Sequence, residues 1–134
     1  MITLSRKVDY ALLLLSDLGR KSEEYTSLRE IAKARNLPLK FLGQVANSLK
    51  RGNIVLSREG RGGGYKLSKP SDKVSVLDVV RVIDGELTVF NCLKDEKCFS
   101  IRCANRLVWQ MARKALEDTF SRYLLSDLIS GKKE

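Results

Sequence analysis

The sequence predicts a mainly α-helical protein with a small β-hairpin, in which a winged helix-turn-helix domain precedes a long C-terminal dimerisation helix. Three observations predict this fold class. They are two helical segments separated by a tight turn (27–50), a glycine-rich hairpin pattern (54–67) and a long helical pattern (104–129). Two helices and a hairpin in this order are typical of a winged helix.

The first predicted helix, residues 4–20, is apolar on more than one side. Its stripe at helical spacing consists of Leu4, Val8, Ala11, Leu12, Leu15 and Leu18. Leu13 and Leu14 widen this stripe around the helix. Because one core cannot cover both sides, we expect the helix to pack on its own domain and on a second subunit. Gly19 marks its end.

Two shorter helices follow. Ser27-x-x-Glu30 has the form of a capping box, so a helix should begin there and end near Arg35. The segment 36–38 breaks it, and Pro38 suits the first turn of a second helix that runs to about Lys50. The two helices predict a helix-turn-helix.

The second of these helices has an apolar side and a polar side. The apolar side consists of Phe41, Leu42, Val45, Ala46 and Leu49, and the polar side of Lys40, Gly43, Gln44, Asn47 and Arg51. Gln and Asn can pair with an adenine edge, and Lys can reach guanine or phosphate, so the polar side suits a DNA groove. An ordinary solvated helix face remains the alternative.

Residues 54–58 and 64–67 are expected to be strands, with the glycine-rich segment 59–63 between them. On such a hairpin Arg58, Arg61 or Lys66 could contact phosphates or enter a narrow minor groove. A nucleotide-binding loop is disfavoured, because no Gly-Lys-Ser/Thr end and no helix follows the glycines.

Two further helices are expected. Ser75-x-x-Asp78 opens a core helix that ends at Gly85, and residues 104–129 form one long helical pattern. About 25 helical residues span about 37 Å, which is longer than a winged domain needs. We therefore expect the last helix to cross to a partner subunit.

Charge points to nucleic acid. The 134-residue chain carries a net +9, and residues 27–73 hold eleven basic and three acidic side chains, a local net of +8. Such an excess is the electrostatic pattern expected where phosphates are neutralised. Neither a secretion signal nor an apolar run long enough to cross a membrane is evident, so a cytoplasmic, non-membrane protein with reduced thiols is expected.

Cys92, Cys98 and Cys103 are the only cysteines, and they fall within twelve residues of a charged segment. Little apolar surface surrounds them, so packing does not explain the grouping. Three thiolates at this spacing are suited to one metal centre. Catalysis by Cys98 is disfavoured, because the chain has no histidine and no Ser-Lys or carboxylate pair at a recognisable spacing.

Taken together, these motifs resemble the bacterial iron-sulfur regulators of the IscR and NsrR type. The resemblance rests on the segments Ser5–Ala11, Leu28–Ala32, Leu39–Leu42, Gly60–Tyr65 and Val76–Val80, and on the three late cysteines. It implies a homodimeric transcription factor that binds palindromic double-stranded promoter DNA. It also implies a response to redox state, nitric oxide or iron status through an iron-sulfur cluster, either 2Fe-2S or 4Fe-4S.

The resemblance also implies site residues. Lys40, Phe41 and Gln44 match recognition-helix positions, and Arg61 lies in the wing, where Glu59 replaces a frequent arginine. The candidate DNA-binding residues are Arg29, Lys40, Phe41, Gln44, Asn47, Arg51, Arg58, Arg61 and Lys66. The expected units are a winged helix-turn-helix domain (1–85), a cysteine cluster-binding loop (86–103) and a dimerisation helix with tail (104–134).

The cluster needs a fourth ligand beside Cys92, Cys98 and Cys103, and without histidine this implies an oxygen ligand. By resemblance to the NsrR branch, Asp9 of the other subunit would supply it in trans; a surface carboxylate paired with a lysine is the alternative. The x4 gap before Cys103 is shorter than the usual one. A zinc site with one carboxylate, and a thiol switch that forms a disulfide, remain open.

Overall fold

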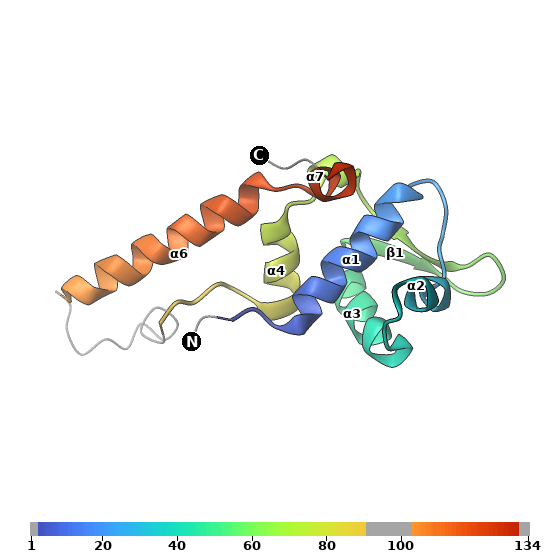
Figure 1. Ribbon diagram of the computed structural model, residues 1–134, viewed down its shortest axis with the longest axis horizontal. Coiled ribbons are helices and arrows are strands. Elements are labelled where there is room, and N and C mark those ends of the chain that lie inside the picture. Colours follow the sequence, from blue (N-terminus) through green and yellow to red (C-terminus); the bar gives the residue numbers. More distant parts are fainter. Residues whose placement is uncertain (1–2, 91–102, 132–134) are drawn as a thin grey trace.

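The computed structural model describes residues 3–90 and 103–131, which form a mostly helical body from which one long helix extends (Figure 1). The elements are α1 (Arg6–Arg20), α2 (Leu28–Arg35), α3 (Leu39–Arg51), β1 (Val55–Arg58), β2 (Gly64–Leu67), the 3-10 turn η1 (Ser71–Lys73), α4 (Val76–Asp84), α6 (Ala104–Arg122) and α7 (Leu125–Ser130). The predicted fold class is confirmed.

Local capping explains where two helices begin. At α4 the capping box is complete: Asp78 N donates to Ser75 Oγ at 3.1 Å, and Ser75 N donates to the Asp78 carboxylate at 3.0 Å. At α2 only half of the box forms, with Glu30 N donating to Ser27 Oγ at 3.2 Å. The Glu30 carboxylate instead accepts from Lys21 Nζ at 2.9 Å.

Helix α1 is the centre of the body. Its Leu14, Leu15 and Leu18 are fully buried, and it packs against α3, α4, β2 and α7. A Cβ added at Gly19 would overlap Ile129 of α7, so the glycine permits this close approach. Helix α7 of the same chain covers part of the second side of α1, whereas Leu12 and Leu13 stay half-buried. The expected contact of α1 with a second subunit stays a prediction.

The predicted single helix over 104–129 is also wrong, because α6 ends at Arg122 and the next two residues are extended. Val76 N donates to Tyr123 O, and Leu125 N donates to Val74 O, both at 2.9 Å. This pairing beside the start of α4 replaces helical hydrogen bonds. The Asp127 carboxylate accepts from Leu124 N at 2.9 Å, and α7 then returns to the core, where Leu125 is fully buried.

Helix α6 has no buried residue. On the side toward α4, Arg113 forms ion pairs with Glu117 at 2.8 Å and Glu86 at 3.4 Å. Trp109 stacks on Phe90, with ring centroids 5.2 Å apart. The opposite side is an exposed apolar stripe of Leu107, Val108, Met111 and Ala115. Within the described ranges no helix has the length and apolar character needed to span a bilayer.

Strands β1 and β2 pair antiparallel from Val55↔Leu67 to Arg58↔Gly64. The segment before α2 pairs with β2 on the side away from β1, since Thr26 and Tyr65 exchange two backbone hydrogen bonds of 2.9 Å. The β1–β2 hairpin is called the wing below. It projects beside α2 (Figure 1).

Candidate nucleic-acid interface

Helix α3 has a buried apolar side and an exposed polar side, as its sequence predicts. Leu42, Val45, Ala46 and Leu49 are buried with at most 1% exposure. Lys40, Gln44, Asn47 and Arg51 are exposed. Asn36 enables the turn before α3 by adopting a left-handed conformation at φ 55°, and Pro38 then precedes the first helical residue. The four polar side chains therefore form an exposed face on a helix whose other side is held in the core.

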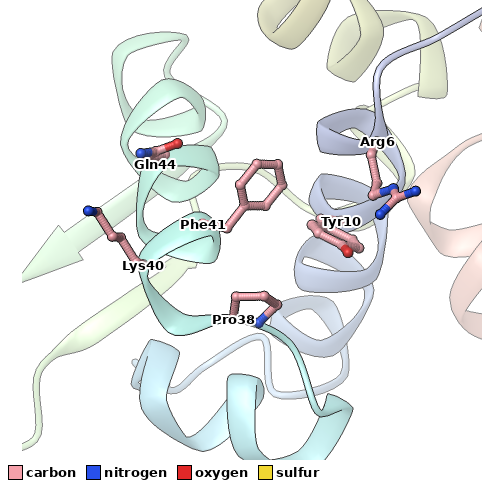
Figure 2. Close-up of a pocket in the computed structure, with 6 residues that line it drawn as sticks. All are labelled: Arg6, Tyr10, Pro38, Lys40, Phe41 and Gln44. Carbon is pink, nitrogen blue, oxygen red and sulfur yellow. The ribbon is translucent and has the colours of Figure 1, made fainter.

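Phe41 lies apart from this face. Its ring meets Tyr10 of α1 edge to face, with centroids 5.1 Å apart and planes at 89°. Lys7 Nζ is 5.9 Å from the centroid of the Phe41 ring. Figure 2 shows the Phe41 ring directed toward α1, whereas Lys40 and Gln44 point away from it. Phe41 is half-buried, so it joins α1 to α3 more than it extends outward.

A shallow pocket of about 400 Å³ opens where α1 and α3 meet. It is lined by Arg6, Tyr10, Pro38, Lys40, Phe41 and Gln44 (Figure 2). The lining combines two aromatic rings with cationic and polar side chains. The structure thus places Arg6 and Tyr10 beside the predicted reading face. Neither was among the predicted site residues, since the spacing within the first helix indicates its apolar stripe but not its neighbour.

The predicted wing residues differ in their surroundings. The Arg58 guanidinium and Lys66 Nζ both lie over the ring of Tyr25, whereas Arg61 is exposed near the tip. Arg29 is exposed on α2, and Arg51 is exposed at the end of α3, where its Nη2 donates to Ser48 Oγ at 3.4 Å. The wing, α2 and α3 therefore each present cations.

Ion pairs fix α1 relative to α2. The Arg35 guanidinium donates to both oxygens of Asp17, at 2.7 and 2.9 Å, and Arg20 adds a bond of 2.8 Å. The hydrogen bond from Arg35 is the main cause that lowers the pKa of Asp17, and the same bond raises the pKa of Arg35. A bidentate pair restrains orientation as well as distance, so Asp17 helps to position the helix-turn-helix.

The predicted metal ligands are only partly within the described residues. Cys103 is half-exposed and directly precedes α6, whereas Cys92 and Cys98 lie outside the described residues. Asp9 is exposed on α1 and forms no ion pair within residues 3–90 and 103–131. In those ranges no three acidic or thiol side chains gather at one point. The described part of one chain therefore does not assemble a metal site by itself.

The comparisons with known proteins agree with this geometry. Residues 4–131 match the model of the Rrf2 family, described as iron-dependent transcriptional regulators. The chain is 32% identical to the HTH-type transcriptional regulator CymR of Bacillus subtilis, over 95% of this chain and 89% of that protein. It is 28% identical to the regulator NsrR of Oceanobacillus iheyensis, over 99% and 93%.

Solved structures show the same fold. The structure of CymR, the global cysteine regulator of B. subtilis, matches with a TM-score of 0.83 and 30% identity, over 99% of this chain and 100% of that chain. IscR of T. potens matches with a TM-score of 0.79 and 26% identity, over 98% and 89%. These relatives are regulators rather than enzymes, and the predicted resemblance to IscR and NsrR is confirmed. The chain belongs to the Rrf2 family of DNA-binding, winged-helix transcriptional regulators.

Proposed function

We propose that the protein is a homodimeric regulator in the cytoplasm that binds palindromic promoter DNA and senses redox state, nitric oxide or iron status through an iron-sulfur cluster. One observation carries this proposal: α6 holds both ends of the cysteine-containing segment. Phe90 stacks on Trp109 of α6, and Cys103 is the residue that precedes α6. A change at the cysteines would therefore act directly on the helix proposed to join two subunits.

The apolar stripe of α6 supports the dimer. Leu107, Val108 and Met111 are 60%, 56% and 65% exposed and lie on the side away from α4. A contiguous exposed apolar stripe on a helix is typical of an interaction surface. A second copy would bury the same residues of both chains, as a two-fold interface requires. The proposed units remain 1–85, 86–103 and 104–134.

A dimer would present two copies of α3 to the two halves of a palindrome. Gln44 and Asn47 would read base edges, and Lys40 would reach guanine or phosphate. Arg29, Arg51 and the wing cations Arg58, Arg61 and Lys66 would contact the DNA backbone or the minor groove. Phe41 would act through its contact with Tyr10, by setting the position of α3 on α1.

The donor set fits an iron-sulfur cluster of the 2Fe-2S or 4Fe-4S type. Cys92, Cys98 and Cys103 would hold it as thiolates, and Asp9 of the partner subunit would complete the ligands. Asp9 is suited to this role because it is exposed and forms no ion pair with any described residue. When bound, the cluster supplies a group that reacts with oxidants and nitric oxide.

A second candidate is a thiol switch without a cluster. It is favoured by the similarity to CymR, which is named a global cysteine regulator. In that case two of the three thiols would form a disulfide, and oxidation alone would change DNA binding. A zinc site formed by the same three cysteines and a carboxylate is another alternative to the cluster.

Anaerobic purification followed by native mass spectrometry and visible absorption tests the proposal. We expect a brown dimer that contains two or four irons and matching sulfide per subunit, and a colourless Cys98→Ser variant that still dimerises. A colourless parent protein that contains zinc, or no metal, would contradict the cluster. If diamide then altered DNA binding, the thiol switch would replace it.

Asp9→Ala tests the fourth ligand separately. We expect a changed absorption spectrum and faster loss of iron in air. Asp72→Ala, which removes an exposed carboxylate that forms no ion pair with any described residue, serves as the control and should leave the spectrum as in the parent. An Asp9→Ala spectrum and iron-loss rate equal to those of the parent would exclude Asp9 as a ligand.

A further inference from the structure

Tyr25 lies in the segment between α1 and α2 and contacts two cations of the wing. The Arg58 guanidinium carbon is 4.6 Å from the centroid of its ring, and Lys66 Nζ is 5.0 Å from it. Both distances are within the range of about 6 Å over which a ring attracts a cation. Arg58 is on β1 and Lys66 is on β2, so a single ring holds side chains from both strands.

The backbone beside this ring is paired with the wing. Thr26, which follows Tyr25, pairs with Tyr65 through two hydrogen bonds of 2.9 Å. A Cβ added at Gly64 would overlap the Thr26 carbonyl, and Gly64 has φ +138°, a conformation that suits glycine. The backbone next to Tyr25 is therefore attached to β2 of the wing, close to the turn between the two strands.

Arg58 also links the ring to the tip. Its Nη2 donates to the carbonyl of Gly62 at 2.8 Å. Within the described residues no other hydrogen bond is formed by the Arg58 guanidinium, so its remaining N–H groups can donate to a phosphate. Arg61 has no hydrogen bond or ion pair through its side chain within the described part of the chain.

We propose that Tyr25 is a positioning residue of the DNA interface: its ring holds Arg58 and Lys66 against the wing for contact with phosphates and supports the tip that presents Arg61 to the minor groove. This inference rests on the proposed contact of the wing with DNA. It divides the three wing cations into two that are held in place and one that reads the groove.

The test compares Tyr25→Leu with Tyr25→Phe on a 30-base-pair duplex that carries a palindrome selected from a random library by the parent protein. We expect Tyr25→Leu to weaken binding about fivefold, because two exposed cation–π contacts are lost. Tyr25→Phe keeps the ring and should bind within about twofold of the parent. Equal losses in both variants, or no loss in Tyr25→Leu, would overturn the proposal.

A double-mutant cycle separates positioning from general stability. In an Arg58→Ala background, Tyr25→Leu should cost less binding than it does in the parent, since the contact is already absent. Independent, additive losses would overturn the proposal. In the DNA-free protein, proton NMR should show the Lys66 ε-protons shifted upfield by the ring, with the shift lost in Tyr25→Leu. Unshifted ε-protons in the parent would also overturn it.

Alanine variants of the three wing cations separate the contact of the wing with DNA from the role of Tyr25. If Arg58→Ala, Arg61→Ala and Lys66→Ala all bind DNA like the parent, the wing does not contact DNA, and the proposed role of the wing fails together with this inference. If they weaken binding and Tyr25→Leu does not, only the role of Tyr25 is wrong. Replacing A·T pairs by I·C pairs under the wing, which preserves the minor-groove pattern, should leave the Arg61 effect intact.

Discussion

Helices α1 and α6 both carry apolar residues at helical spacing, but they differ in burial. Over 15 residues α1 buries Ala11, Leu14, Leu15 and Leu18 completely. Over 19 residues α6 buries none, and its Met111 is 65% exposed. The two helices therefore contribute differently to the monomer: α1 organises its core, and α6 lies outside it (Figure 1).

This difference shows that the spacing of apolar residues indicates which side chains share a helix face, but not which part of the structure packs on that face. Part of the second side of α1 is covered by α7, more than a hundred residues later in the same chain. The apolar stripe of α6 has no such cover among the described residues. In our proposal a second copy supplies it.

The largest expected effect comes from removing a core side chain of α1. Leu14→Ala should lower the free energy of unfolding by about 3 kcal/mol, because it leaves a cavity in a fully buried site. Leu107→Ala on α6 should cost less than about 1 kcal/mol at low protein concentration. Urea denaturation at two protein concentrations measures both. A concentration-independent loss of about 3 kcal/mol in Leu107→Ala would contradict the comparison.

A charge in the α6 stripe should dissociate the dimer. Met111→Glu would place a carboxylate in the proposed interface, and we expect the dissociation constant to rise at least about tenfold, and roughly thirtyfold if the site is central. Sedimentation equilibrium measures it. Gln110→Glu, exposed and about a quarter turn away, is the control. A Met111→Glu dimer as tight as the parent would show that another surface joins the subunits.

Helix α3 and the wing are expected to contribute differently to DNA binding. Gln44→Ala should weaken binding to the preferred palindrome about tenfold and reduce discrimination between sequences. Lys66→Ala should weaken all sequences alike and lower the salt slope by about one. Fluorescence anisotropy over a salt series separates the two. Equal loss on all sequences in Gln44→Ala would mean that the α3 face does not read bases.

The smallest expected effect comes from removing the ionic link between α1 and α2. The Arg35 hydrogen bond lowers the pKa of Asp17 below the ordinary value of 3.8. The link therefore stabilises the fold above that pH, and the contribution is lost as the pH falls through the lowered pKa. Asp17→Asn should cost about 1 kcal/mol at pH 7 and less below pH 3.8 in urea denaturation.

Asp118→Asn on α6 is the matched control, since Asp118 is exposed and its carboxylate has no ion pair in the described ranges. It should leave the free energy of unfolding nearly unchanged at either pH. If Asp17→Asn cost the same at every pH, the loss would come from packing rather than from the ion pair.

Much of the fold followed from local chemistry. The capping serine Ser75, the turn at Asn36–Pro38 and the strands around residues 59–63 each carry their signal within a few residues, and each prediction was confirmed. The break at Tyr123 was missed because its cause is a backbone pairing with residues 74–76, far away in sequence. Tyr25 was missed for a similar reason, since a loop tyrosine gives no sign of which cations it will meet.

The sequence by itself determined the order of helices and strands, the concentration of positive charge around α3 and the wing, and the grouping of three thiols. Hydrophobic spacing, capping and turn residues act over short stretches, so they can be read along the chain. Only the tertiary structure decided that α7 covers α1, that Phe41 packs on Tyr10, and that Tyr25 holds Arg58 and Lys66. Those contacts depend on how distant segments pack, which no local pattern records.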